Sequence, residues 1–128
     1  MKFGDAEELF TKFRCAFYNG DFSKCRDLMK QIAEENRLET LKYFLEQAEL
    51  ALEVWEYGLI EAIPCKNLEI IKLIIDYIRK NKEEHEQERI DSSIVCAVQT
   101  VTDCEACNML KSSEAVKMIK YIMDCYCN

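Results

Sequence analysis

Cysteines are the residues best able to do chemistry in this chain of 128 amino acids, which contains eight of them. Four of them stand near the C-terminus as a C-x2-C pair, Cys104 and Cys107, and a C-x-C pair, Cys125 and Cys127. Zinc prefers four ligands in a tetrahedron, and a C-x2-C pair in a loop can direct both sulfur atoms at one ion. This pattern makes the four residues candidate zinc ligands.

Two other states of the cysteines stay open. Unlinked thiols act as small apolar side chains and need no function, whereas an even number of cysteines also fits disulfides, which are typical of secreted domains. Cys15 and Cys25 lie at matching ends of two predicted helices and could meet. A zinc site would require the last helix to end before Cys127. On a regular helix the side chains of Cys125 and Cys127 would diverge by about 200°, so they could not bind one ion together.

Few other residues are arranged for catalysis. The single histidine, His85, stands in a charged run over 79–89 and is expected at the solvated surface. A thioredoxin-like role for Cys104 and Cys107 would need a βαβ unit, which the pattern lacks. Serine-hydrolase, P-loop and dinucleotide-binding motifs do not occur. We therefore expect no enzyme, no catalytic residue and no cofactor except zinc; catalysis by a cysteine thiolate is the remaining enzymatic alternative.

Composition narrows the range of partners. With 17 Lys and Arg against 24 Asp and Glu, the net charge is −7, which disfavours binding to nucleic acid and to anionic membranes. No apolar run reaches the roughly 18 residues that a membrane span needs, and the N-terminus does not read as a secretory signal. We expect a cytoplasmic protein whose partner is another protein.

Helical spacing of apolar residues predicts an all-α fold with about seven helices in one domain, 1–128. Three glycines and one proline are too few for a many-stranded β fold. Asp5 and Asn67 are the expected N-caps of two helices, and Pro64 should end a third. The segment 102–111 is expected to be a loop. The predicted helices span 5–18, 22–34, 38 to 45 or 47, 50–63, 68–80, 90–101 and 113–126.

Three segments share one pattern, in which a helix with a small residue is followed by a short turn and an amphipathic helix. They cover 13–29, 59–75, and 94–99 together with 113–123. In the first two, Ala16 aligns with Ala62 and Asp21 with Asn67. The segment 36–45 repeats the second helix without a clear preceding partner. Small residues let two helices approach closely, and each pair then needs a neighbour to cover its other side.

This pattern resembles the helix-turn-helix part of ankyrin repeats, best in LIEAIPCKNLEIIKLII at 59–75. The T-P-L-H start of that family is missing, and the spacing is about 45 residues instead of about 33. Degenerate pairs of this kind are similar to those in some large DNA virus proteins. The resemblance implies antiparallel helix pairs in an ankyrin-like stack; a generic seven-helix globule is the alternative.

The leading functional hypothesis is a non-enzymatic protein–protein interaction module or adaptor, and the resemblance extends it to a viral or host-directed role. A row of glutamates at helical spacing is a candidate docking surface for a basic partner. Trp55 and Tyr57 are expected in the core but would anchor a partner if exposed. The alternative is a small zinc-stabilised regulator that uses the four C-terminal cysteines. An uncapped end of the stack would also allow a homodimer. The glutamates of the row are Glu46, Glu49, Glu53 and Glu56.

Overall fold

The computed structural model describes residues 3–81 and 86–127, and over these residues it contains seven α-helices, one short 3-10 helix and no strand. This confirms the predicted all-helical fold. The elements are α1 (Phe3–Tyr18), α2 (Phe22–Glu34), α3 (Leu38–Glu46), η1 (Ala48–Leu50), α4 (Ala51–Ala62), α5 (Leu68–Lys80), α6 (Gln87–Ala106) and α7 (Ser112–Cys127).

Two predicted helix ends agree with the structure. The Asn67 side chain accepts a hydrogen bond from the Ile70 backbone N–H at 3.0 Å and so caps α5. Helix α4 ends at Ala62, two residues before Pro64 and close to the predicted end at 63. Ile63 keeps helical backbone angles, with φ −63° and ψ −52°, so the predicted effect of the proline on the residue before it is not what ends the helix.

Two other expectations were wrong. Helix α1 begins at Phe3, so Asp5 lies inside the helix and is not its N-cap. Helix α6 continues to Ala106 and takes in half of the segment expected to be a loop. The reason is that Val101 and Cys104 are buried and extend the face of α6 that packs on the core, so tertiary contacts support helical turns that looked irregular in the sequence.

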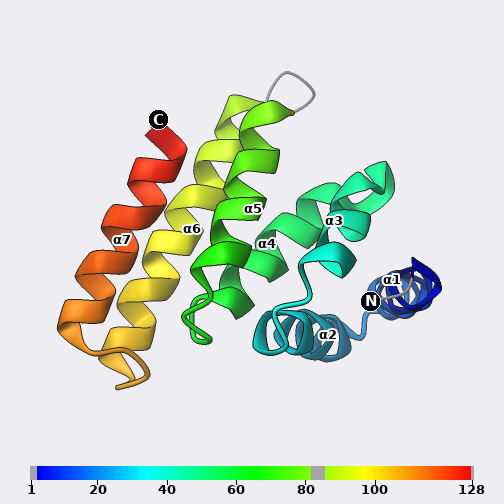
Figure 1. Cartoon of the computed structure of the whole chain (residues 1–128), viewed down its shortest axis with the longest axis horizontal. Coiled ribbons are helices and arrows are strands. Elements are labelled where there is room, and N and C mark those ends of the chain that lie inside the picture. The colour runs from blue at the N-terminus through cyan, green and yellow to red at the C-terminus, as the bar shows by residue number, and fades with distance from the viewer. Residues whose placement is uncertain (1–2, 82–85, 128) are drawn as a thin grey trace.

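The helices follow one another in layers along the long axis of the molecule (Figure 1). Helix α1 packs against α2 and α3. Helix α2 then packs against α4 and α3 against α5, while α4 and α5 in turn pack against α6 and α7. Helix α4 lies at the centre of this arrangement, with α2, α3, α5 and α6 around it.

Close packing around α4 depends on a glycine. A Cβ atom at Gly58 would lie 2.6 Å from Ile74 Cδ1 of α5 and 3.2 Å from Met29 Cε of α2. The absence of a side chain therefore lets α4 approach two neighbours at once. Ala16 and Ala62, the small residues that the sequence pattern singled out, are also buried.

The α1–α2 and α4–α5 turns have the same backbone geometry. Gly20 and Lys66 both adopt a positive φ, 75° and 57° respectively. The Asp21 N–H donates to the Ala16 carbonyl at 2.9 Å, and the Asn67 N–H donates to the Ala62 carbonyl at 3.1 Å. These bonds satisfy carbonyls at the end of the preceding helix. The sequence alignment of the two turns therefore has a structural counterpart.

The α2–α3 and α6–α7 turns repeat this geometry. Asn36 has φ 50°, and the Arg37 N–H donates to the Ile32 carbonyl at 2.9 Å. Asn108 has φ 62°, and the N–H of the next residue, Met109, donates to the Cys104 carbonyl at 2.8 Å. The segment 36–45, for which the sequence revealed no clear preceding partner, follows α2 through a turn of the same geometry.

Candidate functional site

The four candidate zinc ligands do not come together. Cys104 lies at the α6–α7 turn, where its carbonyl accepts from Met109, whereas the Cys125 carbonyl accepts from Arg79 at the C-terminal end of α5. Helix α7 runs back beside α6 (Figure 1), and its 16 residues span about 24 Å. Cys107 follows α6 directly and Cys127 ends α7. The two thiol pairs therefore lie at opposite ends of these helices.

The local geometry also opposes a shared metal ion. Helix α7 remains regular through Cys127, so the side chains of Cys125 and Cys127 diverge. Among the described residues, no group of three or more His, Cys, Asp or Glu side chains could hold a metal ion. The predicted four-thiolate zinc site is not formed.

All eight cysteines fall within the described residues, and each is a free thiol. The Cys25 thiol is buried and donates to the Phe13 carbonyl at 3.6 Å, while Cys15 is exposed, so these two do not meet. Burial raises the pKa of the Cys25, Cys65 and Cys104 thiols above its ordinary value. Because the thiolate is the nucleophile, this environment opposes catalysis by these three residues. His85 lies outside the described residues.

The predicted row of glutamates is divided among three elements and does not follow one helix face. Glu46 ends α3, Glu49 lies in η1, and Glu53 and Glu56 belong to α4. The break falls at Gln47, whose extended backbone, with ψ 106°, separates α3 from η1. Glu46 is therefore separated from the other three.

The two aromatic anchors proposed beside that row are part of the core. Trp55 is 0% exposed, and its ring packs edge-on against Tyr77 at 6.2 Å, so Trp55 cannot reach a partner. Tyr57 is half-buried, with its ring edge-on to Phe13 at 6.1 Å. The side chains belong to the core because α4 is enclosed on several sides.

Different aromatic residues are exposed beside the glutamates. Tyr18 is 61% exposed and Phe22 is 49% exposed. The ring of Phe17 contacts both, at 5.6 Å and 5.7 Å between centroids. The sequence offered only one signal for this cluster: Tyr18 and Phe22 flank the Asn-Gly turn between α1 and α2.

Tyr18 connects this aromatic cluster to the glutamates. Its hydroxyl donates to Glu49 Oε1 at 2.9 Å, and Arg14 Nη1 lies 3.7 Å from Glu49 Oε2. We call the set Tyr18, Phe22, Glu49, Glu53 and Glu56 the acidic–aromatic surface. It joins α1, α2, η1 and α4, which are brought together only by the fold.

The electrostatics of this surface reflect its crowded carboxylates. Donation to Glu49 raises the pKa of Tyr18, and burial and the negative charges of Glu49 and Glu53 add to this shift. Burial raises the pKa of Glu56, Glu53 adds to the shift, and the Arg89 cation opposes it. At neutral pH the Tyr18 phenol therefore remains protonated beside a negative field.

No described helix combines the length and the apolar character needed to cross a bilayer. Comparison of the chain with protein-family models, with curated proteins and with solved structures finds no match.

Proposed function

We propose that this protein is a non-enzymatic interaction module that binds a basic segment of another protein through the acidic–aromatic surface. The observation that carries the proposal is the exposure of Tyr18 and Phe22, both in contact with the Phe17 ring, with the Tyr18 hydroxyl bonded to Glu49 and the charge of Glu53 acting on the same phenol. Apolar side chains of the partner would contact the two rings, and its lysines or arginines would face the carboxylates.

The energetics of such a contact favour this surface. Aromatic side chains are common anchors at interfaces, because they bury a large area at a small cost in conformational entropy. Tyr18 is already positioned by its hydrogen bond to Glu49 and by the Phe17 ring, which lowers that cost further. A net charge of −7 would speed the encounter with a basic partner and make it sensitive to salt.

The same proposal treats the layers α2–α3, α4–α5 and α6–α7 as degenerate helix-pair repeats of an ankyrin-like kind, with α1 as a cap. The shared positive φ and the shared turn hydrogen bond at Asn36, Lys66 and Asn108 support it. So does the match between LETLKYFLE in α3 and LEIIKLIID in α5. In such stacks, binding surfaces commonly extend over several adjacent units, as the acidic–aromatic surface does.

Binding can be tested with a synthetic amphipathic peptide that carries lysines on one face and leucines on the other. We expect the double variant Tyr18→Ala/Phe22→Ala, and separately Glu49→Gln/Glu53→Gln/Glu56→Gln, to weaken binding by about tenfold or more in fluorescence anisotropy. Glu7→Gln/Glu8→Gln on α1 is the matched control and should bind as the wild type does. A peptide with glutamates in place of the lysines should not bind.

The pH dependence supplies a second readout. Carboxylates lose their charge as the pH falls through their pKa, so binding should weaken on acidification, with Glu56 protonating at a higher pH than an ordinary glutamate. Binding that is unaffected by the two multiple variants, or equal for both peptides, would contradict the proposal.

A further inference from the structure

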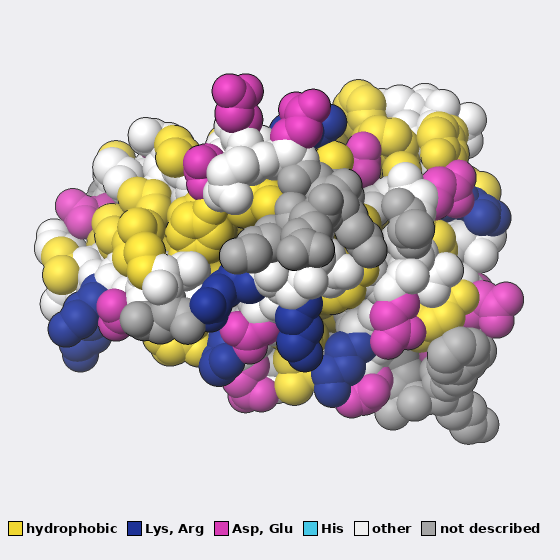
Figure 2. Space-filling view, turned by 90° about the horizontal axis from the view of Figure 1, so that it is seen from above, with side chains coloured by type: hydrophobic (Ala, Val, Ile, Leu, Met, Phe, Trp, Pro, Cys, Tyr) yellow, Lys and Arg dark blue, Asp and Glu magenta, His cyan; other side chains and the backbone are white. Residues whose placement is uncertain are grey.

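We propose that the outer face of the last layer is where two copies of this chain associate. This end face is formed by Val95 and Val98 of α6 and by Val116, Ile119 and Met123 of α7. Val95 and Val116 are each 66% exposed and Met123 is 40% exposed. Hydrophobic side chains gather over the α6–α7 end in the space-filling view, on the left of Figure 2.

The end face contains a shallow groove between α6 and α7. The groove has a volume of about 400 Å³ and is lined mainly by apolar side chains. Its α6 side carries Val95 and Val98, and its α7 side carries Met123 and Tyr126. Exposed apolar faces of this kind, with polar residues at the rim, are typical of interaction sites.

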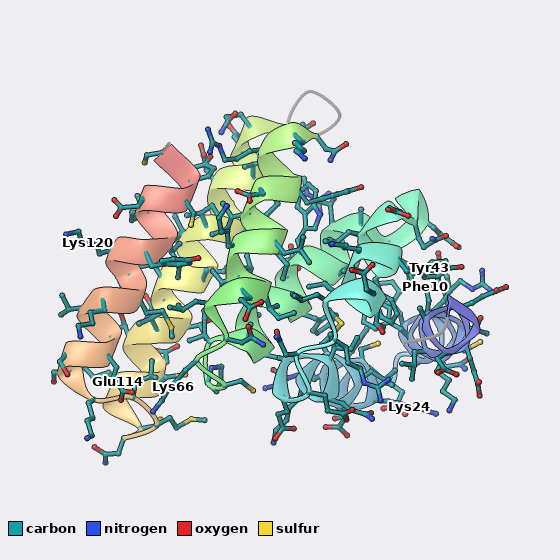
Figure 3. The ribbon with its side chains drawn as sticks, viewed as in Figure 1. Phe10, Lys24, Tyr43, Lys66, Glu114 and Lys120 are labelled. Carbon is teal, nitrogen blue, oxygen red and sulfur yellow. The ribbon has the colours of Figure 1, made fainter. Side chains whose placement is uncertain are left out.

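The charges at the rim indicate a second copy as the occupant. The α6 side of the face carries carboxylates, Asp91 at the groove and Asp103, which accepts from Gln99 at 3.0 Å. The α7 side carries Lys120, which has no ion-pair partner within 3–81 and 86–127. Lys120 points away from the other helices in Figure 3.

A two-fold axis parallel to the helices would place α6 of one copy over α7 of the other. The outer edge of α6, with Asp103, would then face the outer edge of α7, with Lys120, and this contact would occur twice. A self-complementary surface is what a two-fold dimer requires. The valines and Met123 would form the apolar centre of the interface.

Sedimentation equilibrium on the full chain tests the apolar part of this interface. Wild-type protein should dimerise, and Val95→Glu/Val116→Glu should weaken the dimer by about tenfold or more, because it buries carboxylates in an apolar contact. Phe22→Glu, at an apolar residue that is 49% exposed on the acidic–aromatic surface, is the control and should leave dimerisation unchanged. Circular dichroism verifies that each variant remains folded.

Charge reversal tests the identity of the occupant. Asp103→Lys alone and Lys120→Glu alone should each weaken self-association, because like charges then face each other at both contacts. An equimolar mixture of the two variants should recover dimers, since opposite charges again meet at both contacts. A wild type that stays monomeric at all concentrations, or a mixture that does not recover, would overturn the proposal. Peptide binding by the acidic–aromatic surface is measured separately and does not depend on this outcome.

Discussion

Apolar side chains are buried at one end of the stack of helices and exposed at the other. At one end, α1 covers α2 and α3 with a face that includes Phe10, Phe13 and Ala16, all buried. Aromatic rings from two helices pack together there, because the ring centroid of Phe44 in α3 lies 5.2 Å from that of Phe10 and 5.7 Å from that of Phe13. Figure 3 shows Phe10 and Tyr43 near each other at this end.

At the other end, the outer face of α6 and α7 has no further helix over it among residues 3–81 and 86–127. Val95 and Val116 are exposed there, whereas other valines of the chain, Val54 and Val101, are buried in the core. Each layer therefore presents apolar side chains on two sides, and α1 of the same chain covers them at one end. The end face is where that cap is missing.

The largest expected difference in stability is between a substitution at the covered end and one at the open end. Phe13→Ala should lower the free energy of unfolding by about 3–5 kcal/mol, because it leaves a cavity among aromatic rings. Val95→Ala should change the free energy of unfolding of the monomer, measured at protein concentrations below dimerisation, by no more than about 0.5 kcal/mol, because the side chain is exposed until two copies associate. Urea denaturation measures both; similar losses for the two variants would remove the distinction between a closed and an open end.

An intermediate effect is expected in the middle layer, which is covered on both sides. Gly58→Ala should destabilise the fold by about 1–3 kcal/mol, because the new Cβ atom would lie 2.6 Å from Ile74 Cδ1. Removing that methyl in the background Ile74→Val should reduce the cost of the glycine substitution. A double-mutant cycle by urea denaturation gives the coupling. Equal costs in both backgrounds would show that this close contact does not limit the approach of α4 and α5.

The smallest expected difference in stability is between substitutions at the α4–α5 turn and at the α1–α2 turn. The Asn67 amide caps α5 and also donates to the Ala33 carbonyl at 2.8 Å and to Asn36 Oδ1 at 3.0 Å, whereas Asp21 only caps α2, at 3.2 Å. Asn67→Ala should therefore lower the free energy of unfolding by about 1–2 kcal/mol, and Asp21→Ala should lower it by about 0.5–1 kcal/mol. Thermal denaturation measures both.

Asn67→Asp is the matched control for that comparison, because it keeps the capping oxygen and removes the two donated bonds. Its stability should fall between those of the wild type and Asn67→Ala. Equal stability of Asn67→Asp and the wild type would show that the link from α5 to the α2–α3 turn contributes nothing.

Predictions from the sequence succeeded where the cause is local. The Asn67 cap joins residues three apart, so it could be recognised from neighbouring letters. The predictions failed where the burial of a side chain against distant segments determines the local structure. The helical turns at 102–106 form because Cys104 packs into the core.

The candidate site shows the same division. The sequence identified Glu49, Glu53 and Glu56 but assigned them to one helix face with Trp55 as the anchor, and it grouped four cysteines that lie at opposite ends of two helices. Tyr18 escaped notice because its bond to Glu49 joins residues 31 positions apart.

Local patterns in the sequence were enough to predict the helical class, most helix boundaries and the alignment of the α1–α2 turn with the α4–α5 turn, because hydrophobic periodicity and capping act over a few residues. Only the tertiary structure decided that α1 covers one end, that Trp55 is enclosed and that Tyr18 stands exposed beside the glutamates. Exposure depends on which distant segments pack together, and amphipathic helices of similar pattern can be covered or left open.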